Sequence, residues 1–171
     1  MDRGVFVLKK LASSSVALGV VFFGTVTASY PSIAFEHGVN FTVQSKFNSG
    51  YCLDASEDQH HEGREVYIYR CHGRQNQRWS FTDGADNSSA VVGLFGLCLD
   101  IRGRTVRDNT PVQLWRCYYG PNQQFTVTSA GQIRELQSGK CLTISKPGNR
   151  QPVFIDECNN NDRHQQWVLH R

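Results

Sequence analysis

Short stretches rich in β-forming residues alternate with Gly, Asn, Asp and Ser turns from about residue 40 onward. Runs of this length, bounded by turn residues, are typical of β-strands. No stretch after residue 40 has a sustained 3.6-residue apolar period, which an amphipathic helix would need. The pattern therefore predicts an all-β protein, with strands at Phe41–Gln44, Val66–Tyr69, Val112–Trp115, Phe125–Thr128 and Pro152–Ile155.

One sequence pattern occurs three times in register. Each copy has a Cys-Leu pair, a Val that begins a strand, a second Cys, and a Gln two residues before a closing aromatic residue. A fixed internal period indicates a fold built from equivalent units. The copies read GYCLD (from residue 50), VYIYRC (66) and NQRW (76); GLCLD (96), VQLWRC (112) and NQQF (122); and GKCLT (139), VFIDEC (153) and HQQW (164).

The repeat length decides how these units must assemble. A unit of about 42 residues is too small to bury an adequate core alone. Three units can do so if they close around a shared axis, and a repeat number of three favours closure over an open solenoid. We therefore expect a common core that receives one closing aromatic from each unit, namely Trp79, Phe125 and Trp167.

The chain has six cysteines, two in each repeat. An even number in an exported chain indicates disulfides, although six cysteines allow fifteen pairings. The period of the repeat favours pairing within each unit, because equivalent units then have equivalent bridges. The expected disulfides are Cys52–Cys71, Cys98–Cys117 and Cys141–Cys158.

The N-terminus has the layout of a secretory signal peptide. Lys9 and Lys10 precede a short apolar run, and small residues around Ala28 suit signal peptidase. The alternative is an uncleaved anchor, since residues 11–35 carry no charge, but the strongly apolar part is only about half the ~20 residues that span a bilayer. We expect a signal peptide at 1–28, a short segment at 29–37 and one folded domain at 38–171, with repeats of about 38–81, 82–126 and 127–171.

Charge gives no reason to expect nucleic acid or an anionic membrane as a partner. The net charge is +3, and loss of residues 1–28 leaves 15 basic and 14 acidic side chains. Two glycosylation sequons begin at Asn40 and Asn87, and they matter only if the host glycosylates exported proteins.

Motifs for catalysis, cofactors and metals are not evident in the sequence. It contains no Gly-rich phosphate loop and no nucleophile elbow. All six cysteines belong to the repeat and are expected in disulfides, so a thiol nucleophile is not expected. His60, His61 and His72 invite a zinc hypothesis, but Glu65 stands where the His-Glu-x-x-His motif needs its second His, so a solvated polar loop is favoured. We expect no enzyme activity, no cofactor and no metal.

The Cys-Leu-Asp near the start of a repeat and the Gln-x-Trp at its end resemble those of the ricin-B-type lectins. The resemblance runs from about residue 38 to the C-terminus. It implies a β-trefoil, a six-stranded barrel capped by three hairpins. It also implies carbohydrate binding in shallow pockets, where an Asp and an Asn bond to sugar hydroxyls, an aromatic ring stacks on the sugar, and the Gln supports the Asp.

The resemblance places a complete pocket in each of the first two repeats. A flat aromatic ring suits the apolar face of a pyranose, and an ionised carboxylate makes strong bonds to hydroxyls. The carried-over residues are Asp54, Tyr67, Tyr69, Asn76 and Gln77 in the first repeat, and Asp100, Gln113, Trp115, Asn122 and Gln123 in the second.

The third repeat departs from the family pattern at three pocket positions. Thr143 replaces the Asp, Asp156 replaces the stacking aromatic and His164 replaces the Asn. Gln165 and Trp167 remain, and they suit the core better than a pocket. This repeat is expected to be structural.

Two functions from different classes follow. The first is a secreted, extracellular or periplasmic lectin for galactose-like or N-acetylgalactosamine-like glycans, binding through the first two repeats. The alternative is a cell-binding or adaptor subunit of a multi-chain toxin or secreted enzyme, which docks a partner protein. A carbohydrate-active enzyme is a weaker third option, because nothing places two carboxylates for glycoside cleavage.

Overall fold

The computed structural model describes residues 39–57, 62–83 and 88–171, and within these ranges the chain forms twelve strands, short 3-10 turns and no α-helix. The predicted signal peptide and residues 29–37 lie outside the described residues. The strands are β1 (Asn40–Ser45), β2 (Tyr51–Ala55), β3 (Arg64–Arg70), β4 (Trp79–Asp83), β5 (Ser89–Val92), β6 (Cys98–Ile101), β7 (Thr110–Trp115), β8 (Phe125–Val127), β9 (Ile133–Glu135), β10 (Cys141–Ile144), β11 (Gln151–Asp156) and β12 (Trp167–His170).

Six of the strands form a barrel. The hairpins β4–β5 and β8–β9, together with the pairing of β12 with β1, join neighbouring repeats. Within repeats, β1 pairs with β4 and β5 with β8, and a bridge between Gln132 and Gln166 completes the third repeat. The chain therefore closes on itself, with its last strand beside its first, and no barrel strand is left as an open edge within the described part of the chain.

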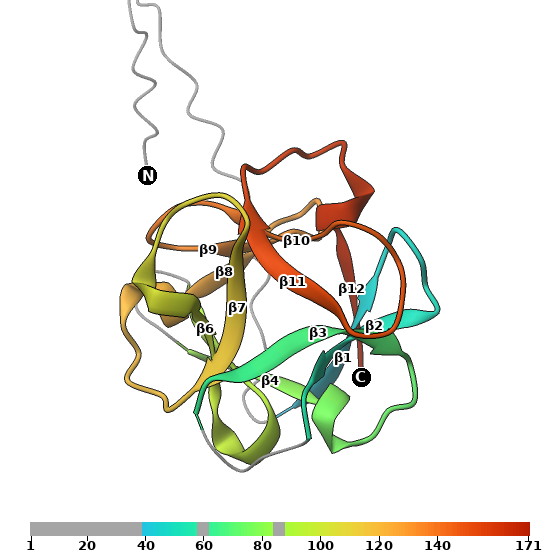
Figure 1. Cartoon of the computed structure of the whole chain (residues 1–171), viewed down its shortest axis with the longest axis horizontal. Coiled ribbons are helices and arrows are strands. Elements are labelled where there is room, and N and C mark those ends of the chain that lie inside the picture. The colour runs from blue at the N-terminus through green and yellow to red at the C-terminus, as the bar shows by residue number, and fades with distance from the viewer. Residues whose placement is uncertain (1–38, 58–61, 84–87) are drawn as a thin grey trace, which may run out of the picture.

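The other six strands form three hairpins over one end of the barrel: β2–β3, β6–β7 and β10–β11. Their second strands meet in pairs, because β3 contacts β7, β7 contacts β11 and β11 contacts β3. Figure 1 looks onto this cap, where the three strands converge around a pseudo-three-fold axis. The all-β class and the β-trefoil fold are confirmed.

The predicted strands coincide with observed ones. Four of the five ranges lie entirely inside β1, β3, β7 and β11, and the fifth overshoots β8 by one residue at Thr128. Each repeat contributes four strands, two to the barrel and two to the cap. Thr128 is a turn residue instead, and its backbone N–H donates to Gln132 O in the tight connection to β9.

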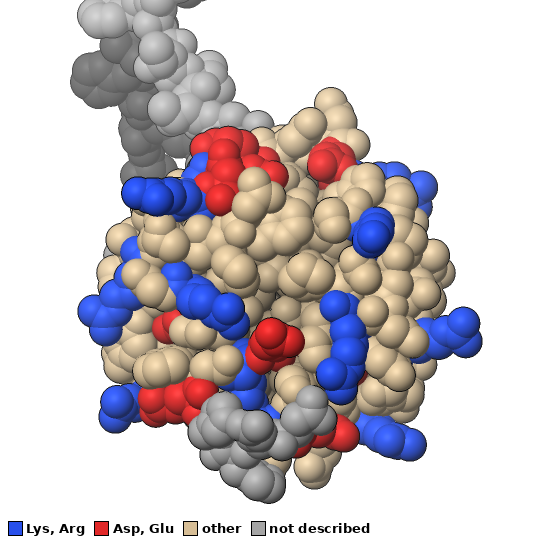
Figure 2. Space-filling view, in the orientation of Figure 1, with Lys and Arg blue, Asp and Glu red and all other residues tan. Residues whose placement is uncertain are grey.

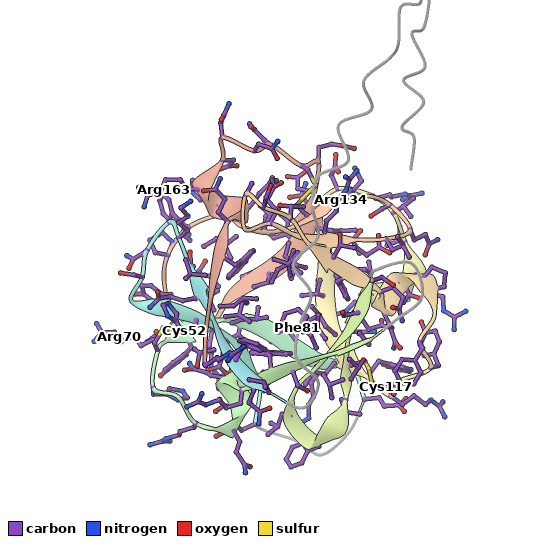
Figure 3. The ribbon with its side chains drawn as sticks, turned by 180° about the vertical axis from the view of Figure 1, so that it is seen from behind. Cys52, Arg70, Phe81, Cys117, Arg134 and Arg163 are labelled. Atoms are coloured by element: carbon purple, nitrogen blue, oxygen red, sulfur yellow. A yellow bond between two sulfur atoms is a disulfide. The ribbon has the colours of Figure 1, made fainter. Side chains whose placement is uncertain are left out.

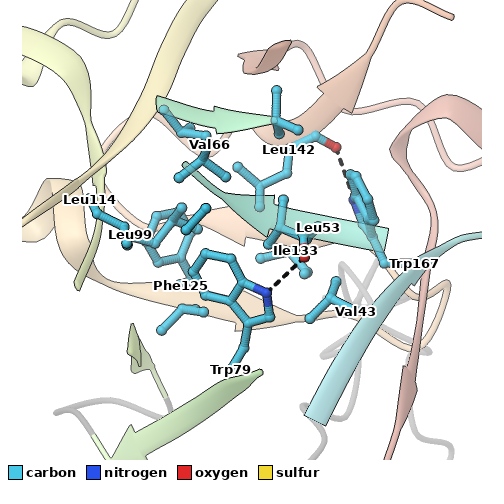
Figure 4. Close-up of a cluster of buried hydrophobic side chains, with 14 of the residues drawn as sticks. Val43, Leu53, Val66, Trp79, Leu99, Leu114, Phe125, Ile133, Leu142 and Trp167 are labelled. Carbon is cyan, nitrogen blue, oxygen red and sulfur yellow. Dashed lines mark hydrogen bonds between the residues drawn. The ribbon is translucent and has the colours of Figure 1, made fainter. Parts of the chain in front are cut away.

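The closing aromatics meet in a common core, as expected. Trp79, Phe125 and Trp167 are at most 4% exposed, and equivalent leucines and isoleucines from all three cap hairpins pack against them. The indole Nε1 of Trp79 donates to Leu53 O at 3.0 Å, and that of Trp167 donates to Leu142 O at 3.2 Å (Figure 4). Each Trp thereby satisfies its polar atom while it fills the barrel.

The three disulfides are Cys52–Cys71, Cys98–Cys117 and Cys141–Cys158, the pairing predicted from the repeat. Each bridge ties the first strand of a cap hairpin to the loop after its second strand, and Figure 3 labels Cys52 and Cys117 on opposite sides of the molecule. Among the described residues, no helix has the length and apolar character to cross a membrane.

Candidate functional site

The first-repeat site forms where the β2–β3 hairpin meets the 3-10 turn η1 (Gln75–Gln77). In the antiparallel register of this hairpin, Asp54 lies opposite Tyr67 and Cys52 opposite Tyr69. The chain leaves β3 at Cys71, and Gly73, with φ of +69°, turns it back toward the hairpin. The turn η1 then delivers its two buried amides beneath the carboxylate.

Asp54 is the centre of a buried hydrogen-bond network. Its side chain accepts from Asn76 Nδ2 on Oδ1 at 2.9 Å and from Gln77 Nε2 on Oδ2 at 2.7 Å. The second hydrogen of Gln77 Nε2 goes to Arg70 O, while Gln77 Oε1 accepts the backbone N–H groups of His72 and Gly73. Gln77 therefore fixes both the carboxylate and the loop, and it supports the site from below.

The neighbours of Asp54 offset only part of the cost of burying its carboxylate charge. Burial raises its pKa above the ordinary value, although the hydrogen bond from Gln77, the charge of His72 and the hydrogen bond from Asn76 each lower it. His72 Nε2 lies 3.4 Å from Asp54 Oδ2. Each further hydrogen bond that the carboxylate accepts would stabilise its charged form.

Asn76 carries an unused acceptor at the same place. The residue is 6% exposed, and its Oδ1 is buried without a hydrogen-bond partner. Buried polar atoms are nearly always paired, so an unpaired one beside an undercompensated carboxylate favours a ligand that donates hydrogen bonds. Both side chains border a hollow of about 360 Å³, which is lined by Asp54, Glu57, Tyr67, Tyr69, His72, Arg74, Asn76 and Arg150.

The walls of this hollow are aromatic and charged. Tyr67 is buried and Tyr69 is partly exposed, with ring centroids 6.4 Å apart. The guanidinium of Arg150 lies 5.6 Å from the Tyr67 ring centroid, and the ring of His72 lies edge-on to Tyr69. Figure 2 shows acidic and basic side chains intermingled over this face of the molecule, in keeping with the small net charge.

The second repeat assembles the equivalent residues between β6, β7 and the turn η5 (Pro121–Gln123). Asp100 lies opposite Gln113 in the hairpin register, and Gln113 Nε2 donates to its Oδ1 at 3.0 Å. Asn122 Nδ2 and Gln123 Nε2 both donate to its Oδ2 at 2.9 Å. A further donor, the hydroxyl of Tyr118, lies 3.2 Å from the same oxygen. The predicted aromatic Trp115 is partly exposed and lies opposite Cys98 in the hairpin register, two residues along β7 from Gln113.

The third repeat has no such acceptor. Thr143 donates its hydroxyl to Cys141 O within its own strand, and His164 stacks on Phe47 with ring centroids 3.9 Å apart. Gln165 Nε2 still donates to Glu157 O at 2.7 Å, as Gln77 and Gln123 do to the matching carbonyls. The closing Gln therefore holds the loop in every repeat, whether or not a carboxylate is present.

The structure brings the predicted pocket residues of each of the first two repeats together, and their role in sugar binding stays a prediction. Sequence reasoning assigned no site role to His72, Arg74, Tyr118 or Arg150. His72 and Tyr118 each follow the second Cys of their repeat, a shared position that the repeat alignment could have used. Arg150 belongs to the third repeat, and only the pairing of β11 with β3 brings it to the first hollow.

Apart from His72, the predictions about glycosylation and metal binding concern residues other than those of the two sites. His60, His61 and Asn87 lie outside the described residues, whereas Asn40 is exposed at the start of β1. In the described ranges, no cluster of three His, Cys, Asp or Glu side chains is arranged to hold a metal ion. The prediction of no metal or cofactor therefore stays a prediction for the whole chain.

Curated proteins similar to this chain include plant lectins and a bacterial protein. The agglutinin of Ricinus communis is 44% identical over 70 residues, which are 40% of this chain and 12% of that protein. Beta-galactoside-specific lectin 2 of Viscum album is 37% identical over 71 residues, again 40% of this chain and 12% of that protein. The probable lipoprotein EnvE of Salmonella typhimurium is 29% identical over 124 residues, 70% of this chain and 65% of that protein.

Solved structures with the same fold are more distant in sequence. The designed three-fold symmetric protein ThreeFoil superposes with a TM-score of 0.72 at 23% identity, covering 76% of this chain and 96% of that one. The Polyporus squamosus lectin, bound to the epitope Neu5Aca2-6Galb1-4GlcNAc, superposes with a TM-score of 0.68 at 20% identity, covering 80% and 50%. Both likenesses show the fold alone.

A family model extends the match over three quarters of the sequence. It is described as the ricin-type beta-trefoil lectin domain, and it matches residues 39–167, from the residue before β1 to the closing Trp of the third repeat. The match agrees with the three in-register motifs, the barrel with its three-hairpin cap and the disulfide in each repeat. This chain belongs to the family of ricin-type β-trefoil lectin domains.

Proposed function

We propose that this protein is a lectin and that the hollow of its first repeat binds a sugar unit of a glycan. One observation carries the proposal: Asn76 Oδ1 is buried without a partner next to Asp54, whose burial raises its pKa. Both residues line one hollow, and two neighbouring acceptors suit a ligand with neighbouring hydroxyl groups, because each hydroxyl can donate to one of them. The family membership of the chain supports the same conclusion.

The wall of the hollow suits the rest of a sugar ring. A pyranose has an apolar face of C–H groups, and the ring of Tyr69 offers flat apolar area that needs little ordering on binding. Tyr69 is partly exposed, whereas Tyr67 is 6% exposed and packs deeper. We therefore assign stacking to Tyr69, hydrogen bonding to Asp54 and Asn76, and a supporting role to Gln77.

Galactose-like and N-acetylgalactosamine-like sugars are the first ligands to test. The name of one relative supports this choice, since it is a beta-galactoside-specific lectin, and a second relative is an agglutinin. The matched segments cover only 12% of each of those proteins, so the choice of sugar rests on analogy. The panel should hold neutral and acidic glycans, because Arg74, Arg150 and Glu57 line the same hollow.

The deciding experiment measures binding of the purified protein to a glycan panel and to immobilised galactose. Asp54→Asn and Tyr69→Ala are each expected to lower affinity at least ~10-fold, the effect of about 1.4 kcal/mol. Asp156→Ala is the matched control, because Asp156 occupies the third-repeat position equivalent to Tyr69 and its variant should bind as the wild type does. Unchanged binding by both first-repeat variants would show that the pocket is assigned wrongly.

We also propose that the protein acts outside the cell that makes it and that it binds without catalysis. The predicted signal peptide and the three disulfides support export. One relative, polypeptide N-acetylgalactosaminyltransferase 12 of Mus musculus, is an enzyme by name, but the similarity covers 22% of it. Turnover of any glycoside in a broad substrate panel would contradict the non-catalytic part of the proposal.

The alternative of a cell-binding or adaptor subunit draws support from other relatives. Nigrin b of Sambucus nigra and a ribosome-inactivating protein of Polygonatum multiflorum match over 12% and 11% of their lengths, so related domains occur in much longer proteins. Isolation of the protein from its native secretions distinguishes the two functions. A stoichiometric partner that free sugar does not displace supports the adaptor, whereas retention on glycan that free sugar reverses supports the lectin.

A further inference from the structure

The first two repeats differ at the residue that follows the second cysteine, which is His72 in one and Tyr118 in the other. The Tyr118 hydroxyl lies 2.7 Å from Asn122 Oδ1 and 3.2 Å from Asp100 Oδ2. It therefore donates to the amide oxygen, with the carboxylate as a longer alternative acceptor. In the first repeat the equivalent amide oxygen, Asn76 Oδ1, is buried without a partner.

The carboxylates of the two repeats also differ in how fully they are used. Asp54 accepts one side-chain hydrogen bond on each oxygen, with His72 Nε2 at 3.4 Å as its only other close neighbour among the described groups. Asp100 accepts three side-chain hydrogen bonds, from Gln113, Asn122 and Gln123, and the Tyr118 hydroxyl lies 3.2 Å from its Oδ2. A carboxylate offers about four lone-pair positions, so Asp100 has about one left, and the Tyr118 hydroxyl lies beside it.

Two neighbours hold Tyr118 in this position. The guanidinium carbon of Arg104 lies 4.8 Å from the centre of the Tyr118 ring. A Cβ at Gly120 would come within 2.4 Å of a ring carbon, so the absence of a side chain there makes room for the tyrosine. The ring is therefore placed by its hydroxyl, by a cation and by a glycine.

We infer that Tyr118 occupies the place of a ligand hydroxyl and closes the second-repeat pocket, so that the protein binds glycan at one site and not at two. This inference rests on the proposed function of the first repeat. The closed pocket keeps the same polar side chains as the open one. Two differences affect its acceptors. Gln113, which stands where the first repeat has Tyr67, donates to Asp100 Oδ1. The Tyr118 hydroxyl occupies the acceptors Asn122 Oδ1 and Asp100 Oδ2 that a sugar hydroxyl would use.

The test restores the second pocket in a protein that lacks the first. Asp54→Asn removes binding at the first repeat, and Tyr118→His on that background gives the second repeat the residue found in the first. We expect the double variant to regain binding to galactose-terminated glycans to at least ~10-fold above Asp54→Asn alone. Tyr119→His on the same background is the control, since Tyr119 is 59% exposed and its side chain makes no hydrogen bond to Asp100 within the described residues.

Tryptophan fluorescence gives a local readout of the second pocket. The protein has three Trp residues, of which Trp79 and Trp167 are buried in the core, whereas Trp115 is partly exposed and lies two residues along β7 from Gln113, the residue opposite Asp100. Lactose should leave the Trp fluorescence of the wild type nearly unchanged, because Tyr67 and Tyr69 line the first hollow and, among the described residues, no Trp does. Lactose should change it in Tyr118→His, in which the second pocket is open.

Each outcome either supports or overturns the inference. Regained binding with a lactose-dependent Trp signal supports it. Three results would overturn the inference and leave the proposed function standing. They are two binding sites in the wild type, residual binding of Asp54→Asn that Asp100→Asn removes, and a folded double variant that binds no better than Asp54→Asn. A wild type that binds no glycan in the panel would overturn the proposed function, and the inference with it.

Discussion

Replacing the pocket aspartates by asparagine should cost different amounts of stability in the two repeats. Asn is nearly the same size as Asp, but one carboxylate oxygen becomes an NH₂ group that cannot accept hydrogen bonds. The cost therefore depends on whether the surrounding donors can rearrange. The two networks differ in this respect, although their residues are equivalent in sequence.

At Asp54 the network can adapt. The new amide can keep its oxygen toward Gln77 and turn its NH₂ toward Asn76, whose own amide then rotates so that Oδ1 accepts the bond. Rotation adds no unpaired buried atom, because Asn76 Oδ1 has no partner in the present arrangement and Nδ2 takes its place. The variant also removes a charge whose burial is poorly compensated, so we expect Asp54→Asn to change the free energy of unfolding by less than about 1 kcal/mol.

At Asp100 the network cannot adapt in the same way. Three donors surround Oδ2, so the NH₂ group must face Gln113. Gln113 would have to rotate its amide and give up the bond that its Oε1 accepts from Arg102 Nε at 3.3 Å. One buried donor then stays unpaired, which typically costs ~1–3 kcal/mol, and charge-assisted bonds become weaker neutral ones. We expect a loss of about 2 kcal/mol.

Urea unfolding with the disulfides intact measures both values, provided that the slope m is the same for the wild type and the variants. The prediction concerns the difference between two matched variants, so errors in the absolute extrapolation largely cancel. A loss at Asp54 as large as that at Asp100 would refute the reasoning. It would mean that both carboxylates serve the fold equally and that Asn76 has no spare acceptor.

Three further predictions follow from single features. Glycan binding should weaken as the pH falls through the pKa of Asp54, because binding needs the ionised carboxylate. Since burial raises that pKa, binding titrations from pH 7 to 4 should show a loss of affinity at a higher pH than the one at which an ordinary exposed Asp is protonated. Gly93→Ala should destabilise the fold by ~1–3 kcal/mol, measured by urea unfolding, because its Cβ would lie 2.6 Å from the Trp79 ring; an unchanged midpoint would show that the indole can shift freely. Replacing Cys141 and Cys158 together by Ser should cost about 3 kcal/mol, the loop-closure value for a bridge of this span, and an equal midpoint with and without the bridge would contradict it.

The repeat made most of the fold predictable. Equivalent Cys, Leu, Val and aromatic positions in three copies specify equivalent strands, and units too small to fold alone must share a core. The five predicted strands, the three disulfides and the burial of Trp79, Phe125 and Trp167 are all found in the structure. The same motif brought the predicted polar residues of each pocket together, because they lie at fixed places on one hairpin and the turn after it.

The sequence by itself therefore determined the architecture, the covalent links and the residues that gather around Asp54 and Asp100. Only the tertiary structure decided which acceptor atoms around Asp54 and Asp100 are already paired with donors of the protein. Arg150 reaches the first hollow because β11 pairs with β3 across the cap, a contact between residues far apart in the chain. The Tyr118 hydroxyl donates to Asn122 Oδ1 in the second repeat, whereas the equivalent Asn76 Oδ1 stays unpaired in the first. This difference depends on side-chain directions and distances of a few ångströms that a repeated motif does not encode.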